Sequence, residues 1–310
     1  MKTVRIVKSW YSPDIMRQTP KSSGLWDNIK FTDAEIEECD YVIVSNYPSR
    51  DVRVKCYPEN IWCVLQEPPN EYFKYFHNAD KVYTQVFMQD LSLRENRFIH
   101  TQPALPWHID KSYDQLKREK YLRKQKKLSC ISSDKTEFRG QWERLNFIRG
   151  IRNEVDFDLF GKGLNYIKDK WEALAPYRYS LIIENYRGPH YWSEKLADCF
   201  LAFTMPIYYG CTNISDYFPN ESMAVIDINE KGVDRKIKEI TESNLWKKNH
   251  EAVSFSRDLI LNKYQFFPFM AGFIKKWELK EKEKRKSWIT LRNETSLIKN
   301  ALRKFKRMMK

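Results

Sequence analysis

Apolar residues in the first part of this chain fall in short runs separated by longer polar segments. The runs are rich in Val, Ile, Tyr and Trp, a composition typical of buried strands. They are VRIV (4–7), YVIVS (41–45), IWCVL (61–65) and KVYTQ (81–85). Short buried runs at such intervals predict a parallel sheet with crossover connections.

The same pattern starts again after residue 127. The later runs are LSCISS (128–133), VDFDLFG (155–161), YSLIIE (179–184), MPIYYG (205–210) and MAVIDI (223–228). A helix is predicted between two of them, in SEKLADCFLAF, because its apolar residues recur at helical spacing on one face. The sequence thus predicts two α/β units. Ligands of open α/β sheets bind beyond the carboxyl ends of the strands, so we expect the site in a cleft between the units.

Positive charge is concentrated in two segments of the chain. The formal net charge is +13, of which residues 111–127 carry +6 and residues 266–310 carry +10, so the remainder is close to neutral. These segments set the predicted boundaries. We expect an N-terminal domain over 1–110, a basic linker or helix over 111–127, a C-terminal domain over 128–265 and a basic helical tail over 266–310.

The end of the tail has apolar residues at alternating spacings of three and four. They are Trp288, Leu291, Thr295, Ile298, Leu302, Phe305 and Met309. This spacing predicts a basic amphipathic helix over 286–310, which suits an anionic membrane surface. The alternative is a helix that packs on its own domain or on a partner.

Cysteine usage and the N-terminus bear on the compartment. The six cysteines are scattered, without a C-x-x-C pair or a zinc-type spacing, so we expect free thiols in a reducing environment. The sequence begins without the apolar stretch of a signal peptide, and no apolar run is long enough to span a membrane. A cytoplasmic protein, peripheral on the inner face of the cell membrane, is expected.

One segment has the order strand, polar turn, helix. Glu184 and Asn185 follow a predicted strand, and Ser193 precedes a predicted helix whose N-terminal N–H groups, with Lys195 beside them, would seat a phosphate. The alternative is a capped helix whose first residues, Glu194 and Lys195, are only solvated. Spacing alone leaves both interpretations open.

A D-x-D pattern at Asp156 and Asp158 could indicate a divalent metal site. These aspartates alternate with apolar residues in VDFDLFG, as expected of a half-buried strand with one wet face. We therefore expect no metal site here, and we expect a structural role for His108 in LPWHID.

The segment YSLIIENYRGPHYWSEKLADCFLAFTMPIYYG resembles the donor-binding signature of glycosyltransferase family 10, the α-1,3/1,4-fucosyltransferases, in a bacterial-type member. The matching residues are Glu184, Asn185, Tyr191, Glu194, Lys195, Pro206 and Gly210. Ser193 replaces the family's Thr and keeps the hydroxyl. Tyr186 and Trp192 depart from the pattern and are expected to add bulk near the sugar pocket.

Two further segments support this resemblance. SSDKTEFRGQWERL is similar to a family motif that would make Arg139 a phosphate-binding arginine. VLQEPPNEYFKYFHNAD is similar to a stretch of the acceptor domain that would make Glu67 the catalytic carboxylate. DLFGKG (158–163) resembles the D-x-F-G that precedes the donor site in the family.

The resemblance implies a GT-B fold, with two Rossmann-like domains that face each other across a cleft. The N-terminal domain would bind a glycan acceptor and the C-terminal domain GDP-fucose, in an inverting reaction without a metal or other cofactor. Glu67 would be the general base, and Arg139 and Lys195 would neutralise the diphosphate. The remaining donor-binding residues would be Glu184, Asn185, Tyr191, Ser193 and Glu194.

Three questions of function stay open in the sequence. The donor could be another nucleotide sugar, because Tyr186 and Trp192 depart from the family. The acceptor is expected to be a surface polysaccharide or lipopolysaccharide precursor. A basic nucleic-acid-binding protein is the rival of another class, but it should carry its charge on a folded face with aromatic residues between the cations. Here the charge lies in two segments, so no nucleic-acid partner is expected.

Overall fold

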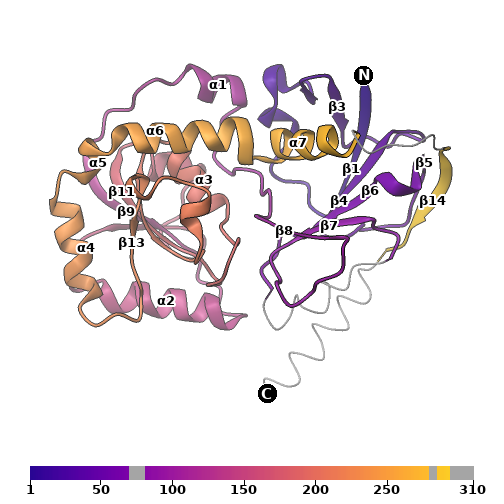
Figure 1. The fold of residues 1–310 in the computed structure, drawn as a ribbon. Helices are drawn as coiled ribbons and strands as arrows, with labels where there is room; N and C mark the ends of the chain where they lie inside the picture. The colour runs from indigo at the N-terminus through magenta and orange to yellow at the C-terminus, as the bar shows by residue number, and fades with distance from the viewer. Residues whose placement is uncertain (70–80, 279–284, 294–310) are drawn as a thin grey trace. The chain divides into compact units, whose positions relative to one another are not determined.

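The computed structural model describes residues 1–69, 81–278 and 285–293. The chain forms two compact units, each with its own sheet (Figure 1). Unit 1 takes in residues 1–105 and 266–310, and unit 2 takes in residues 106–265. Unit 1 is therefore built from both ends of the chain, and unit 2 from its middle.

The sheet of unit 1 has seven strands in the order β2-β3-β1-β4-β6-β7-β8. All neighbouring pairs are parallel except β2 with β3. The strands are β1 (Lys2–Lys8), β2 (Leu25–Trp26), β3 (Ile29–Thr32), β4 (Tyr41–Ser45), β6 (Ile61–Val64), β7 (Gln85–Met88) and β8 (Phe98–His100). The predicted parallel sheet is confirmed, although the run KVYTQ lies mostly in a turn and β7 starts at its last residue.

Both faces of this sheet are covered by the C-terminal part of the chain together with β5 (Val52–Cys56). On one face, α7 (Phe266–Glu278) packs its aromatic residues among the strands, and the rings of Phe31 and Phe267 meet edge to face at 5.2 Å. On the other face, β14 (Ser287–Leu291) pairs antiparallel with β5 and buries Leu291 in a second apolar cluster.

The prediction of a separate basic helical tail over 266–310 is therefore wrong for the described residues, although Phe266–Glu278 is a helix. Helix α7 is rich in Phe, Met and Ile, and it belongs to the core of unit 1 because such a helix is stable only when that apolar surface is covered. Residues 287–291 alternate in exposure as an edge strand does, and they do not form the start of an amphipathic helix. Residues 294–310 of the predicted membrane helix lie outside the described residues.

Unit 2 holds a five-stranded parallel sheet in the order β10-β9-β11-β12-β13. This is the 2-1-3-4-5 order of doubly wound nucleotide-binding folds. The strands are β9 (Lys126–Ile131), β10 (Asp158–Phe160), β11 (Tyr177–Ile183), β12 (Met205–Tyr209) and β13 (Ala224–Val225). The strand order places the carboxyl ends of β9, β10 and β11 side by side.

Six α-helices of the described residues accompany this sheet (Figure 1). They are α1 (Tyr113–Arg118), α2 (Arg139–Ile151), α3 (Glu194–Leu201), α4 (Val233–Glu242), α5 (Leu245–Lys248) and α6 (His250–Leu259). The predicted basic linker over 111–127 is part of this unit. A capping box of Ser112 and Gln115 starts α1, and the buried Lys124 donates to Ala175 O, Ala202 O and Thr204 Oγ1.

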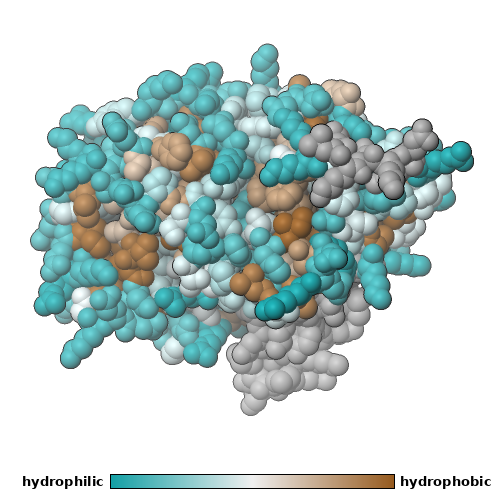
Figure 2. Space-filling view, viewed as in Figure 1, coloured by the Kyte–Doolittle hydropathy of each residue, from teal (hydrophilic) through white to brown (hydrophobic). Residues whose placement is uncertain are grey.

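The cysteine side chains are buried, and the viewed surface is mostly hydrophilic (Figure 2). None of the six cysteines, all of which the structure describes, forms a disulfide, as predicted, and all six are buried. Figure 2 shows hydrophilic residues over most of the viewed face, with only small hydrophobic patches between them. None of the helices in the described ranges has the length and apolar character needed to cross a bilayer.

Candidate functional site

The candidate site begins where β11 ends, at Glu184. Its carboxylate is fully buried and accepts hydrogen bonds from the Ser193 backbone N–H at 2.8 Å and from Ser193 Oγ at 2.7 Å. Lys195 Nζ lies 3.2 Å from the same carboxylate. Ser193 Oγ also accepts from the Lys195 backbone N–H, so the predicted helix cap is confirmed. Glu184 therefore fixes the start of α3 against the end of the sheet.

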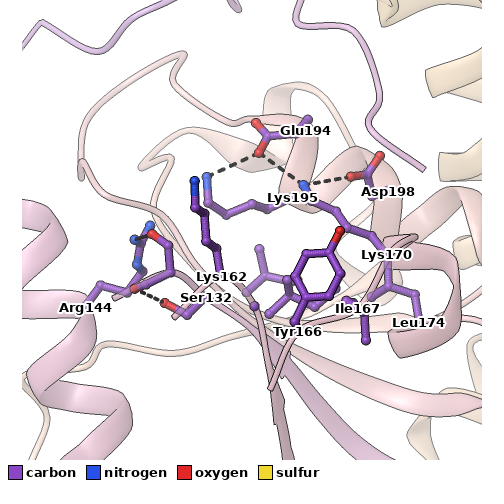
Figure 3. Close-up of a pocket in the computed structure, with 14 residues that line it drawn as sticks. Ser132, Arg144, Lys162, Tyr166, Ile167, Lys170, Leu174, Glu194, Lys195 and Asp198 are labelled. Atoms are coloured by element: carbon purple, nitrogen blue, oxygen red, sulfur yellow. Dashed lines mark hydrogen bonds and ion pairs between the residues drawn. The ribbon is translucent and has the colours of Figure 1, made fainter. Parts of the chain in front are cut away.

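Helix α3 presents Glu194, Lys195 and Asp198 to a pocket of about 280 Å³ (Figure 3). Lys170, in the short turn before β11, bridges the two carboxylates: its Nζ lies 3.4 Å from Glu194 and 3.1 Å from Asp198. In Figure 3 the ends of Lys162 and Lys195 point to the same side of the pocket as Glu194. Glu194 and Asp198 thus fix the positions of the Lys170 and Lys195 ammonium groups.

Neighbouring charges and burial shift the pKa values of Glu194, Lys170 and His108. Burial alone would raise the pKa of Glu194, but Lys195 and Lys170 hold that pKa well below its ordinary value, so this carboxylate is ionised at neutral pH. The pKa of Lys170 is raised, because Asp198 and Glu194 outweigh the cost of its burial. The pKa of His108 is lowered, mainly by burial, which favours the neutral imidazole at neutral pH.

Arg144 forms the opposite wall of the pocket. It projects from α2, is only 6% exposed, and donates from Nη2 to Ser133 Oγ at 3.4 Å. Its Nε is buried and has no hydrogen-bond partner among the described residues. A buried donor of this kind is costly unless a ligand satisfies it, and a guanidinium is suited to phosphate oxygens.

Two close backbone approaches shape the strand ends. Gly161, just after β10, has a φ of +137°, and a Cβ there would lie 1.6 Å from the carbonyl oxygen of Ser132. Gly140 brings the start of α2 against Asn185, where a Cβ would lie 1.8 Å from the carbonyl oxygen. Glycine is therefore needed at both positions, and the pocket lies at the carboxyl ends of β9 and β10, where open sheets bind ligands.

Four cations line this pocket: Arg144, Lys162, Lys170 and Lys195. Two carboxylates, Glu194 and Asp198, line it with them, and the buried Glu184 pairs with Lys195 from behind the pocket. The net positive charge and the unsatisfied guanidinium nitrogen together suit an anionic group such as a diphosphate.

The structure brings together most, but not all, of the predicted donor-site residues. Glu194 and Lys195 line the pocket, and Glu184 and Ser193 support them from behind. Tyr191 is buried and donates to Asn185 Oδ1 at 3.4 Å. Glu67, the predicted base, is exposed just beyond β6 in unit 1.

Two predicted features differ from what the structure shows. The Arg139 side chain is 89% exposed, pairs with Glu143 at 2.7 Å, and is not among the residues that line the pocket. Trp192 is buried in the aromatic core of unit 2, with its ring 5.2 Å from that of Phe218, and does not line the pocket either. Its bulk therefore fills the core instead of this pocket.

Sequence reasoning missed Arg144, Lys162 and Lys170. A signal for Arg144 existed, because it adjoins Leu145 on the face of α2 that also carries Ile148 and Ile151. A charged side chain on the buried face of a helix is rare unless it has a partner, so its position there indicates a functional or structural role. Lys162 stood within the motif DLFGKG, and nothing in the sequence around Lys170 indicated its role.

The alternation of buried and exposed residues predicted around the D-x-D pattern is confirmed, although strand β10 begins only at Asp158. Val155, Phe157 and Leu159 are buried, whereas Asp156 and Asp158 are exposed. Asp158 accepts a hydrogen bond from Tyr177 Oη at 2.6 Å and pairs with Lys126 at 3.2 Å. Within the described ranges, no group of three or more His, Cys, Asp or Glu side chains could hold a metal ion.

Two Rossmann-like units, each built on a largely parallel sheet, are the architecture of the GT-B fold class, so the predicted fold class is confirmed. Solved structures of α1,3-fucosyltransferases share this fold. One has a TM-score of 0.51 with 15% sequence identity over 92% of this chain and 91% of that chain. Another, solved with GDP-fucose, has a TM-score of 0.50 with 16% identity over 92% of this chain and 93% of that chain.

The sequence comparison agrees with this fold. No family model matches the chain. The α-(1,3)-fucosyltransferase FucT of Helicobacter pylori is 36% identical over 62 residues, which are 20% of this chain and 13% of that protein. The match thus spans only a small part of this relative. The predicted resemblance to the fucosyltransferases of family 10 is confirmed.

Proposed function

We propose that this chain is a glycosyltransferase that binds a nucleotide diphosphate sugar in the pocket of unit 2. The observation that carries the proposal is the cluster of Arg144, Lys162, Lys170 and Lys195 at the carboxyl ends of a parallel sheet. The four cations outnumber the three carboxylates that pair with them, Glu184, Glu194 and Asp198, so the pocket keeps a net positive charge that would attract a diphosphate. The buried, unpaired Nε of Arg144 gives this anion a specific donor.

The most suitable donor is GDP-fucose. This choice rests on the resemblance to the fucosyltransferase signature and on the short segment similar to the Helicobacter pylori enzyme. A different nucleotide sugar with the same fold and mechanism is the alternative. The cationic pocket would bind the diphosphate of either donor. Discrimination between GDP-fucose and another nucleotide sugar must therefore come from groups around the base and the sugar.

The reaction we propose is a single displacement with inversion. The acceptor hydroxyl oxygen attacks the anomeric carbon, the bond from that carbon to the phosphate oxygen breaks, and Glu67 takes the hydroxyl proton. The diphosphate leaves with its charge held by Lys195 and Arg144. These cations would do the work that a metal ion does in other transferases, so we expect no metal requirement.

The acceptor we propose is a hydroxyl of a surface polysaccharide or a lipopolysaccharide precursor. The enzyme would then work in the cytoplasm, at the inner face of the membrane. Residues 294–310 carry six Lys or Arg and one acid, which favours an anionic lipid surface. Co-sedimentation with phosphatidylglycerol vesicles, but not with phosphatidylcholine vesicles, would support this. Equal binding to both would count against it.

The experiment that tests the function has two arms. Calorimetry should detect GDP binding to the full chain, and the control titration with UDP should bind more weakly. A hydrolysis and transfer screen with GDP-fucose, GDP-mannose and UDP-sugars, run in EDTA, should show turnover with a GDP-sugar. Absence of GDP binding, or activity only with a UDP-sugar and manganese, would contradict the proposal.

A further inference from the structure

A second pocket, of about 210 Å³, lies in unit 1 beside the carboxyl ends of β1 and β3. Its lining includes Arg5 and Lys8 from β1, Trp10 and Tyr11 just after this strand, and Asp33 just after β3. This is the edge of the unit 1 sheet at which ligands of open parallel sheets bind. The pocket is distinct from the diphosphate seat, whose lining lies entirely in unit 2.

Most of the charges around this pocket are paired with one another. Lys8 Nζ lies 3.2 Å from Asp33 Oδ2, and Arg50 pairs with Glu35. Each of these two ion pairs has no net charge, so they add hydrogen-bonding groups to the pocket but no net positive charge. The remaining charged group is Arg5.

Arg5 is a buried guanidinium that reaches the pocket. It is 8% exposed, and its Nη1 donates to the backbone carbonyl of Ile36 at 2.7 Å and to that of Arg53 at 3.5 Å. Among the described residues, no carboxylate forms an ion pair with it. Glu35 attracts Arg5 through its charge, but the direct ion pair of Glu35 is with Arg50. A buried cation without a direct ion pair is costly, so an anionic group in the pocket would be bound favourably.

Aromatic rings border the same pocket. The Tyr11 side chain is 92% exposed, and Trp10 donates from its indole N–H to Gln66 Oε1 at 3.2 Å. The backbone N–H of Gln66 is in turn held by Asn46 Oδ1 at 2.7 Å. Trp10 is therefore fixed to the residue that precedes Glu67. Flat aromatic faces beside a few polar groups are well suited to a sugar ring.

We propose that this pocket binds an acidic sugar residue of the acceptor glycan, with its carboxylate on Arg5 and its ring against Trp10 and Tyr11. The assignment as an acceptor subsite rests on the proposed function, but the binding of an acidic sugar does not. The tie from Trp10 through Gln66 places the bound sugar on the same strand ends as Glu67. The acceptor would therefore be an anionic glycan in preference to a neutral one.

The direct test is binding of methyl β-D-glucuronide to the full chain, measured by ligand-observed NMR titration in the absence of any nucleotide. The matched neutral probe is methyl β-D-glucoside, and inorganic phosphate tests for an anion without a sugar ring. We expect the glucuronide to bind at least about fivefold more tightly than the glucoside, because a charge-assisted hydrogen bond separates them. Salt should reduce this preference.

Variants assign the binding to named groups. Arg5→Met should abolish the preference for the glucuronide, Arg5→Lys should retain part of it, and Tyr11→Ala should weaken both sugars. Tyr11 is almost fully exposed, so this last change should not affect folding. Tyr121→Ala, at a tyrosine of unit 2 that is 62% exposed, is the matched control and should change nothing.

Two results would overturn the proposal. One is equal binding of glucuronide and glucoside by the unmodified chain. The other is phosphate binding as tight as that of the glucuronide, with Tyr11→Ala without effect on either. GDP calorimetry on the same samples reports the proposed donor site independently, so a failure of the glycosyltransferase assignment can be told apart from a failure of this subsite.

Discussion

The ammonium of Lys195 lies 3.2 Å from the carboxylate of Glu184, and it lies 3.8 Å from that of Glu194. One lysine thus joins the buried end of β11 to the pocket. Glu184 also accepts hydrogen bonds from Ser193, so the start of α3 has a support besides this lysine. The positioning of the cation and its binding role can therefore be separated by mutation.

We expect Lys195→Ala to weaken GDP binding by roughly 10–100-fold. A charge-assisted hydrogen bond contributes about 1.5–3 kcal/mol, which corresponds to this range. Calorimetric titration with GDP measures it. Lys238→Ala, on the exposed side of α4, is the control and should bind GDP normally. An unchanged affinity in Lys195→Ala would remove this lysine from the site.

The two arginines of α2 offer a matched comparison. Arg144 is buried in the pocket wall, whereas Arg139 is exposed and paired with Glu143. We expect Arg144→Met to weaken GDP binding by about tenfold or more, because a charged donor to phosphate is lost. Arg139→Met should change the affinity by less than about twofold, as for an exposed pair. The reverse order would restore Arg139 as the phosphate ligand that the family motif predicted.

Glu67→Gln should reduce sugar transfer by about 100-fold or more and leave GDP affinity unchanged. General base catalysis supplies gains of this order, and the amide cannot take the proton. Transfer assays with GDP-fucose and calorimetry on the same protein separate the two effects. Glu95→Gln, at an exposed glutamate of unit 1, serves as the control. Transfer at the normal rate in Glu67→Gln would exclude this residue as the base.

The stability of unit 2 should depend on acid through Glu194. Its folded pKa lies well below the ordinary value of 4.5, so its stabilising effect is present above about pH 4.5 and is lost as the pH falls toward the folded pKa. We expect the Tm difference between the unmodified chain and Glu194→Gln to be largest at neutral pH and to shrink below pH 4.5. Thermal unfolding from pH 7 to pH 3 measures this. A constant difference across the range would argue against the ionised pair.

The last described strand should matter for the stability of unit 1. Leu291 is 1% exposed within an apolar cluster, whereas Trp288 is 50% exposed and stacks on Arg53. We expect Leu291→Ala to cost about 2–4 kcal/mol of unfolding free energy, because it leaves a cavity. Trp288→Ala should cost only about 0.5–1 kcal/mol, as expected of an exposed cation–π contact. Urea unfolding of both variants compares them, and equal losses would show that β14 is not anchored through Leu291.

The sequence predicted correctly those features that depend on residues close together along the chain. Buried strands with short apolar runs, the Ser193 cap, and the alternation around Asp156 and Asp158 depend on neighbouring residues, so spacing was enough to find them. The fold class also followed, because alternating strands and helices leave few architectures open.

The failures came where distant parts of the chain meet. The stripe from Trp288 onward has helical spacing, but pairing with β5 decided the conformation of residues 287–291, and no local signal reveals a partner more than 200 residues away. The packing of α2 likewise decides which arginine faces the sheet: Arg144 lines the pocket and Arg139 is exposed, so the phosphate-binding role of Arg139 stays a prediction. Trp192 is close in sequence to the predicted donor-binding residues, but its contact with Phe218 in the core of unit 2 depends on tertiary packing that its sequence neighbours do not reveal.

The division of unit 1 between the two ends of the chain has a consequence for biosynthesis. Residues 1–105 leave the ribosome first, but α7 and β14, which cover both faces of their sheet, leave last. Unit 2 is complete in between and can fold while the first sheet still lacks its cover. A chain that stops near residue 265 would therefore expose the apolar faces of the N-terminal sheet, and aggregation, not mere loss of a tail, is the expected fate of such a product.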